Sequence, residues 1–566
     1  MSDQSFYIFR EGRRKVAGER LLANLRASLG RAADENGWTD ALLRAGELEC
    51  ALADAGSASA DVVAGVVGVC ADAVVRRDFR RRGMLARSLP EEVPAELQVS
   101  TPEGFAYYAL DPLAYAEAVE KIGFRRQVSG LRKTGSVVVV GIRSIGTSLS
   151  AVMAAEWQRR GVPAERFTVR PEGHPFERVV RWNAEQRGKI AGAAPDAMFV
   201  IVDEGPGLSG SSFLSVAEAL VAAGVREEQI VLVPGHAPDL SGLCARDAAR
   251  RWARYRCVAV EGGRHPEGEW IGGGQWRAKF CGDESEWPAA WTTMESPKFL
   301  SKDRNVIWKF AGLGPYGERA REQAAALADA GFGTKIVGGE FGYLGQEFVH
   351  GQALRKGDSN LERLRRMAEY CAFRAEKFEC EVSAAQHEDF TTMVRVNFER
   401  GLDEPLMESW AKLEVARPTC CDGKMAPHEW MERDGKMMKL DATEHGDNHF
   451  FPGPCDVAWD LAGAIVEWGM DAFQRGAFLR MYREMSGDDA GARVRNYLLA
   501  YAVFHHGWSR EAARGMRGTA EEERFVRATR KYRAWMERMV HSEARCTGVG
   551  ENAVRRAALP ARTGSD

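Results

Sequence analysis

Three short runs of apolar residues, each near a helical stretch, constrain the fold of this chain most strongly. They occupy residues 136–140, 197–202 and 229–233. Almost every side chain in them is apolar, whereas a strand with one face in water alternates apolar and polar residues. Strands that are apolar on both faces belong to parallel sheets covered by helices on both sides. We therefore predict an α/β domain with a doubly wound parallel sheet over residues 111–262.

Glycine and serine follow two of these strands, where ligands bind to such sheets. The run Asp203-Glu204-Gly205-Pro206-Gly207-Leu208-Ser209-Gly210-Ser211-Ser212 leads from a strand directly into a helix. Glycines permit tight turns in which backbone N–H groups converge on a phosphate, and the hydroxyls and the helix N-terminus add attraction. The carboxylates of Asp203 and Glu204 accept hydrogen bonds from sugar hydroxyls.

This segment resembles the loop that binds phosphoribosyl pyrophosphate (PRPP) in type I phosphoribosyltransferases, in which two acids precede a Thr-Gly-x-Thr-like loop. Residues 140–147 look like the pyrophosphate loop of that family, and residues 170–178 occupy the place of its mobile hood. The resemblance implies Mg²⁺ and PRPP as co-substrate, with pyrophosphate displaced at the anomeric carbon. It assigns binding to Arg143, Ser144, Gly146, Gly207, Ser209, Gly210, Ser211 and Ser212, and catalysis to Asp203 and Glu204.

The spacing departs from that family in one respect. Asp203 lies one residue further than usual from Ser209-Gly210, which leaves open which acid meets which hydroxyl. The alternative interpretation is an ordinary doubly wound domain whose Gly/Ser loop is merely a turn.

A second strand-then-helix unit begins near residue 297. Residues 305–310 alternate as a strand with Lys309 near its end, and the following helix carries Glu322. A strand lysine paired with a carboxylate on the next helix orients nucleotide phosphates in kinases. Residues 342–351, which include Glu347 and Val349, look like the strand and hinge that meet adenine.

Two later motifs resemble those of aminoglycoside-phosphotransferase-like kinases. Lys439-Leu440-Asp441 ends a strand, and Asp456-Val457-Ala458-Trp459-Asp460-Leu461-Ala462 opens an apolar helix. The resemblance implies ATP and Mg²⁺, with Asp441 as metal ligand and Asp460 as a structural residue. Asp422, 19 residues before Asp441, is the candidate for the catalytic-loop aspartate that orients and deprotonates the acceptor hydroxyl.

The catalytic loop of this half is irregular. The usual His-Gly-Asp and the later Asn are absent, and His428 or Glu429 is the conjectured replacement metal ligand. Asp422 is alternatively a turn former before Gly423. Residues 445–449 (HGDNH) remain open as a second register for the catalytic loop, as a metal site, or as a solvated loop.

Composition excludes several other classes. The net charge is −3 with no global basic field, which argues against nucleic acid and anionic membranes; residues 76–82 are the exception, an Arg-rich patch. The most apolar stretch, residues 58–75, contains two aspartates, so no membrane span is expected. The N-terminus lacks the apolar segment of a signal peptide, and the eleven cysteines form no CxxC pair, which indicates a reduced cytoplasmic protein.

These observations predict an α/β plus α+β chain. We expect a helical extension (1–110), a phosphoribosyltransferase-like domain (111–262), a connecting segment (263–294), a two-lobed kinase-like domain (295–540) and a tail (541–566). The expected function is that of a bifunctional transferase with small-molecule substrates, PRPP-dependent in one half and ATP-dependent in the other. The alternative is a non-catalytic nucleotide-sensing regulator on the same two folds. Both acceptors and homo-oligomer formation remain open.

Overall fold

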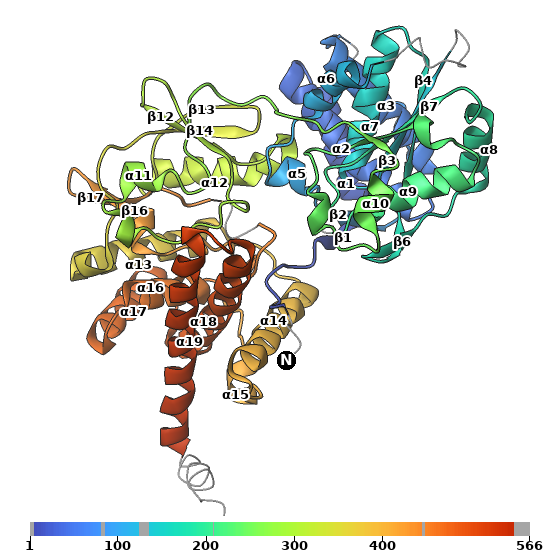
Figure 1. Cartoon of the computed structure of the whole chain (residues 1–566). Helices are drawn as coiled ribbons and strands as arrows, with labels where there is room; N and C mark the ends of the chain where they lie inside the picture. Colours follow the sequence, from blue (N-terminus) through green and yellow to red (C-terminus); the bar gives the residue numbers. More distant parts are fainter. Residues whose placement is uncertain (1–4, 81–84, 124–134, 208, 444–447, 548–566) are drawn as a thin grey trace, which may run out of the picture.

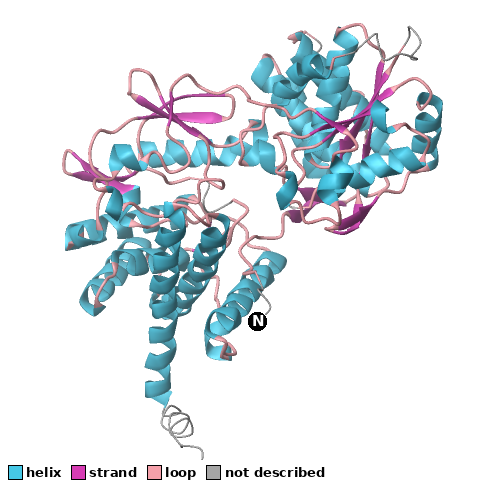
Figure 2. Ribbon diagram, viewed as in Figure 1, coloured by secondary structure: helices cyan, strands magenta, loops and turns pink. Residues whose placement is uncertain are grey.

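The computed structural model describes residues 5–80, 85–123, 135–207, 209–443 and 448–547. An α/β half lies beside a smaller antiparallel sheet, and a helical lobe follows below that sheet in Figures 1 and 2. Within these ranges every helix is too short or too polar to cross a membrane.

The predicted parallel sheet is confirmed. Its strand order is β4-β3-β7-β8-β9, and all neighbouring pairs are parallel. The strands are β3 (Val137–Ile142), β4 (Ala164–Val169), β7 (Met198–Val202), β8 (Ile230–Val233) and β9 (Arg256–Cys257). Every residue of β3 is buried, as expected for a strand covered on both faces.

Helices cover both faces of this sheet. Side chains of α6 (Pro112–Ile122) and α7 (Ile145–Arg159) pack with Val137 and Val139 on one face. On the other face, α8 (Ala184–Ala193), α9 (Ser211–Ala222) and α10 (Ala248–Trp252) pack with Val138 and Val140. Alternate residues of one strand therefore serve two separate cores.

The N-terminal helices belong to the same body as the sheet. Helices α1 (Gly18–Arg31), α2 (Glu35–Asp54) and α3 (Ser59–Arg76) share an apolar core with α7. Contact between α2 and α7 is close enough to require glycine, because a Cβ on Gly46 would lie 2.1 Å from Ser148 Oγ. Beside them, β1 (Arg13–Ala17) and β2 (Glu96–Ser100) form an antiparallel ribbon. The expected boundary at residue 110 thus falls inside a continuous layer.

The Arg-rich patch is only partly described. Arg76, in the last turn of α3, forms an ion pair with Asp72 one turn earlier, and Arg77 Nε lies 3.6 Å from Glu35. Arg81 and Arg82 lie outside the described residues.

The second sheet is antiparallel, with the order β10-β11-β12-β14-β13. Its strands are β10 (Glu269–Trp270), β11 (Lys298–Leu300), β12 (Val306–Phe310), β13 (Ile336–Glu340) and β14 (Tyr343–Glu347), and α12 (Glu318–Asp329) lies between β12 and β13 in the chain. Phe299, Phe310 and Tyr343 share a core with Val139 and Val200 of the parallel sheet. The two sheets are therefore joined by apolar packing as well as by the chain.

Residues 263–294 were expected to be a simple connection. They instead supply edge strand β10 and a short helix, α11 (Arg277–Phe280). Arg277 is buried and forms an ion pair with Glu521 at 2.8 Å, which ties the segment to the last helix of the chain.

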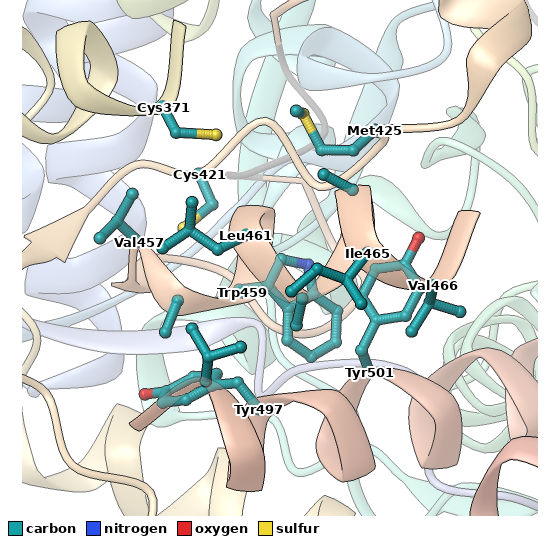
Figure 3. Packing of buried hydrophobic residues seen from close by; sticks show 14 of the residues in the cluster. Cys371, Cys421, Met425, Val457, Trp459, Leu461, Ile465, Val466, Tyr497 and Tyr501 are labelled. Carbon is teal, nitrogen blue, oxygen red and sulfur yellow. The ribbon is translucent and has the colours of Figure 1, made fainter. Parts of the chain in front are cut away.

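The helical lobe is built around α16 (Ala458–Trp468), in which every residue is buried. Figure 3 shows Trp459 and Ile465 of α16 packed against Tyr497 and Tyr501. The surrounding helices are α13 (Leu361–Lys377), α14 (Ala384–Leu402), α15 (Glu408–Ala411), α17 (Ala472–Ser486), α18 (Gly491–Gly515) and α19 (Ala520–Thr547). Two short ribbons complete it, β15 (Pro418–Thr419) with β18 (Cys455–Asp456), and β16 (Trp430–Arg433) with β17 (Lys436–Lys439).

The first residues of the chain also pack on this lobe. Phe6 and Ile8 are buried in its core, and Tyr7 exchanges backbone hydrogen bonds of 2.7 and 2.8 Å with the Asn397 side chain. Arg10 N–H donates to the His449 carbonyl at 2.9 Å. In Figure 1 the N-terminal segment leaves the α/β half and ends beside α14. We call residues 5–10 the N-terminal strap.

Candidate functional site

The parallel sheet places two loops at one crevice. From β3 the chain moves to β4 on one side, and from β7 it moves to β8 on the other. The carboxyl ends of β3 and β7 therefore form a topological switch point, where ligands of such sheets bind. The loops are in close contact there, since a Cβ on Gly146 would lie 2.7 Å from the Val202 carbonyl oxygen.

The loop after β3 is strained and holds donors without partners. Ser144 has φ 121°, which a non-glycine residue rarely adopts, and it immediately precedes α7. Such a conformation costs roughly 1–3 kcal/mol and persists only where its surroundings fix it. Arg143 Nε and Thr147 Oγ1 are buried with no hydrogen-bond partner. Buried donors beside a helix N-terminus fit an anionic group such as a diphosphate.

The loop after β7 is covered by a hairpin. Ser209 Oγ and Ser211 Oγ donate to the Pro175 carbonyl at 2.8 and 2.6 Å. Pro175 lies in the turn between β5 (Glu172–His174) and β6 (Glu177–Val179), the segment expected to be a hood. Gly207 and Gly210 have positive φ, as tight turns require, and Ser212 lies in the first turn of α9. None of the four cavities measured within the described ranges is lined by these serines.

The two acids of this loop are half-buried. Burial raises the pKa of Asp203 to about 7, against the opposing charges of Arg170 and Arg178. Burial and the charge of Asp203 raise the pKa of Glu204 to about 8. Asp54 pairs with both Arg170 and Arg143, so cations are held near the crevice.

These shifts predict how stability depends on pH. Between the ordinary carboxyl pKa and the raised value, the folded chain binds more protons than the unfolded chain. The contribution of Asp203 and Glu204 to the free energy of unfolding therefore falls as pH rises from about 5 to 8. We expect thermal unfolding midpoints to decline less over this range in Asp203→Asn/Glu204→Gln than in the parent. The exposed Asp196→Asn serves as control, and parallel curves for parent and double variant would contradict the assignment.

A second cavity lies between the antiparallel sheet and the helical lobe. Lys309 of β12 is 6% exposed, and its Nζ lies 2.5 Å from Asp441 Oδ1 just after β17. The cavity, about 80 Å³, is lined by both residues and by Glu347, Val349 and His428. The structure thus brings five of the residues named from the sequence to one cavity.

Lysines and acids not named as ligands from the sequence also line this cavity. They are Glu295, Lys298 and Lys424; Glu429, the alternative to His428 as metal ligand, lines it as well. Burial would raise the pKa of Glu429, but its hydrogen bond with His428 and the charge of Lys439 lower it to about 2, so the group is ionised. Among the described residues no cluster of three metal-ligating side chains is preformed. Two carboxylates, Asp441 and Glu429, suit Mg²⁺, which usually takes one or two plus phosphate oxygens.

Glu322 does not reach this cavity. It lies on the exposed side of α12, and no ion pair joins it to Lys309 among the described residues. The buried positions of α12 are Ala320, Gln323, Ala324 and Leu327, so the helix turns Gln323 inward instead. The predicted Lys309–Glu322 pair is therefore wrong. The face of α12 that turns inward carries Gln323, one residue later than predicted.

Asp422 is also placed differently from the expectation. Its side chain is fully buried, accepts from the Tyr370 hydroxyl, and lies 3.3 Å from Lys439 Nζ. It lines neither cavity beside the lobe. Its role as a catalytic base is therefore not supported, because the carboxylate is enclosed by partners and has no access to a ligand.

The loop backbone explains which residue reaches the cavity. Asp460 accepts hydrogen bonds from the N–H groups of Asp422 and Gly423 at 2.8 and 2.9 Å, and Arg374 Nε lies 3.8 Å from the same carboxylate. This anchoring holds residues 422–423 inward, and Lys424 is the next residue to line both cavities. Of the alternative loop at 445–449, residues 445–447 lie outside the described residues.

A larger cavity of about 1310 Å³ adjoins the 80 Å³ cavity and extends into the helical lobe. The two share Lys298, Lys309, Lys424, His428 and Glu429. Its far part is lined by aromatic side chains of α18 and α19, and Tyr107 enters from the α/β half.

The known proteins that this chain resembles are solved structures of low similarity. No family model and no curated protein sequence matches the chain. Among solved structures, the choline kinase LicA from Streptococcus pneumoniae is 16% identical, with a TM-score of 0.30, over 42% of this chain and 89% of that one. An ethanolamine kinase from Plasmodium vivax is 11% identical (TM-score 0.29; 42% and 79%), and an aminoglycoside-3′-phosphotransferase of type VIII is 18% identical (TM-score 0.26; 42% and 94%).

Similarities this low do not carry the assignment of the second half. That assignment rests on the lysine, the acids and the two cavities described above. The resemblance of the first half to phosphoribosyltransferases stays a prediction.

Proposed function

We propose that the C-terminal half is a kinase-like phosphotransferase. It binds ATP with Mg²⁺ in the smaller cavity and transfers the γ-phosphoryl group to a hydroxyl of a small molecule in the larger one. The observation that carries the proposal is the Lys309–Asp441 ion pair at a cavity lined by two further lysines. Fixed cations beside carboxylates suit a polyphosphate with a divalent metal.

The remaining lining residues suggest how the nucleotide is held. Ile307, Val349 and Leu440 offer apolar contact to an adenine ring, and Lys298, Lys309 and Lys424 offer charge to the phosphates. Ile307 and Lys309 lie on the same face of β12 because they are two residues apart. Asp441 and Glu429 would hold Mg²⁺, which neutralises charge on the phosphates when bound.

Phosphoryl transfer does not depend on a strong base. Most of the rate comes from positioning the reactants and from stabilising charge on the transferred group. Lys424 lies between the two cavities and would supply such stabilisation. Asp422 contributes indirectly, because its carboxylate accepts the Lys424 N–H at 3.1 Å and so holds the loop.

For the N-terminal half we propose a phosphorylated-sugar site of the PRPP type at the switch point. Arg143 Nε and Thr147 Oγ1, buried without partners, support an anion there, as do the hydroxyls of Ser209 and Ser211 once Pro175 moves away. Asp203 and Glu204 would face the sugar or its metal. PRPP-dependent release of pyrophosphate with a panel of nucleobases and amines tests this proposal, and no release with any acceptor counts against it.

A nucleotide-sensing regulator is the second candidate, and the burial of Asp422 favours it. A chain that binds ATP but does not consume it would behave in this way. The two candidates differ in turnover and not in binding.

The deciding experiment uses the full chain with ATP and Mg²⁺. Calorimetric titration measures ATP binding, and formation of ADP in the presence of a panel of hydroxylated acceptors, including nucleosides and glycosides, measures turnover. Lys309→Met is expected to weaken binding at least tenfold, whereas Lys302→Met, at an exposed lysine after β11, leaves it unchanged. Binding without ADP formation supports the regulator. No binding to the parent chain contradicts both candidates.

A further inference from the structure

The far part of the larger cavity is an aromatic chamber with unused polar groups. Its walls include Trp291, Phe450, Tyr501, Trp508 and Trp535. Four atoms there, both ring nitrogens of His449, His505 Nε2 and Ser509 Oγ, are buried and have no hydrogen-bond partner. An unmade hydrogen bond at a buried polar group costs about 1–3 kcal/mol, so such groups rarely gather without a ligand to satisfy them.

The acids of this cavity already have partners. Glu467 accepts from the hydroxyls of Tyr501 and Tyr532 at 3.1 and 2.6 Å and pairs with Lys531 at 2.6 Å. Of the other described acids that line the cavity, Glu286 pairs with Arg355 and Glu295 with Lys298, whereas Glu429 lies 3.5 Å from His428 and Asp358 accepts the Arg355 backbone N–H. Glu467, the described acid that contacts the aromatic walls, is therefore already neutralised by Lys531.

The histidines are neutral as well. Burial lowers the pKa of His449 and of His505 to about 4. A neutral imidazole has one donor and one acceptor, a serine hydroxyl has both, and an indole N–H only donates. The chamber therefore offers uncharged donors and acceptors between aromatic faces.

We infer that this chamber binds the phosphoryl acceptor, and that the acceptor is a neutral hydroxylated ring compound with a flat or apolar face, a nucleoside or a glycoside, and not an amine. This inference rests on the proposed phosphotransferase function. Ring faces stack on aromatic side chains, and sugar hydroxyls both donate and accept, as the unpartnered groups require. A cationic amine could stack on these faces, but it would have to displace Lys531 from Glu467, the described acid beside them.

Tryptophan fluorescence of the full chain tests this inference without ATP. The probes are adenosine, phenyl β-glucoside and choline, which separate the two neutral sources from a cation. We expect one or both neutral probes to quench the emission with saturation, and choline not to. Quenching by choline alone, or by none of the probes, overturns the inference.

Ser509→Ala makes the test specific. Because its hydroxyl has no partner, its removal is expected to weaken the neutral probe about five- to tenfold without lowering the thermal midpoint. Ser486→Ala is the matched control: Ser486 Oγ donates to Tyr482 and accepts from Asp488, so this change lowers stability and leaves affinity unchanged. Unchanged affinity in Ser509→Ala contradicts the assignment. Probe binding that Ser509→Ala weakens but that no phosphorylation by ATP follows would uphold the ligand class of the chamber and count against the proposed function.

Discussion

Asp441→Asn is expected to reduce ATP turnover by roughly a thousandfold while the chain stays folded. The substitution keeps the size of the side chain and removes the charge that pairs with Lys309 and, in the proposed site, with Mg²⁺. Loss of one charged group that stabilises a transferring phosphoryl group typically costs a factor of about 10²–10³ in rate, and loss of metal binding adds to it. ADP formation at saturating ATP, with an acceptor that the parent chain phosphorylates, measures the effect.

The control for this change is Asp434→Asn. Asp434 lies in the exposed turn between β16 and β17, and its positive φ is one that asparagine also tolerates. Its turnover should equal that of the parent. If Asp441→Asn retains more than a tenth of the parental rate, Asp441 is not the metal ligand of the reaction.

Asp460→Ala is expected to destabilise the helical lobe by about 3–5 kcal/mol, because it removes a carboxylate that compensates the buried charge of Arg374. Arg374 is 1% exposed and lies 3.8 Å from Asp460, and the N–H groups of Asp422 and Gly423 lose their acceptor as well. Urea unfolding followed by tryptophan fluorescence measures the shift. The exposed Asp329→Ala should change stability by less than about 0.5 kcal/mol.

A double variant tests the cause of this loss. Replacing Arg374 with methionine and Asp460 with leucine removes both charges, so it should restore part of the stability that Asp460→Ala loses. If the double variant is less stable than Asp460→Ala, the lost hydrogen bonds to residues 420–423 contribute more to the free energy of unfolding than the uncompensated charge of Arg374.

Local patterns in the sequence predict part of this molecule well. The unbroken apolar runs predict the parallel sheet because burial on both faces leaves no polar positions. The same reasoning places glycine and serine at the carboxyl ends of β3 and β7. Lys309 and Asp441 each end a strand, and the lobes bring these ends together.

The errors have a common physical origin. Counting back from Asp441 leads to the loop at residues 420–424 but does not reveal which side chain faces the cavity, and Asp460 turns Asp422 inward by accepting its N–H. A helix follows β12 as predicted, but its buried face carries Gln323 and not Glu322. His506 is buried with Nδ1 3.2 Å from the Thr529 carbonyl, whereas His505 lines the larger cavity.

Contacts between distant segments left no local pattern. Residues 263–294 look like a linker because they are rich in Gly, Trp and Pro. Arg277 nevertheless forms an ion pair with Glu521, far along the chain. The N-terminal strap likewise has no amphipathic period, and its partners lie nearly 400 residues away, as for Tyr7 and Asn397. Such contacts depend on the surface of the folded lobe, so neighbouring residues in the sequence do not indicate them.

The N-terminal strap has a consequence for biosynthesis. The ribosome makes Phe6 and Ile8 first, but the core that receives them includes residues from α13 to α19. During translation these two apolar side chains remain exposed to solvent while the α/β half folds, until the helical lobe has been made. A bulky group placed directly before these residues would then hinder their docking on the lobe.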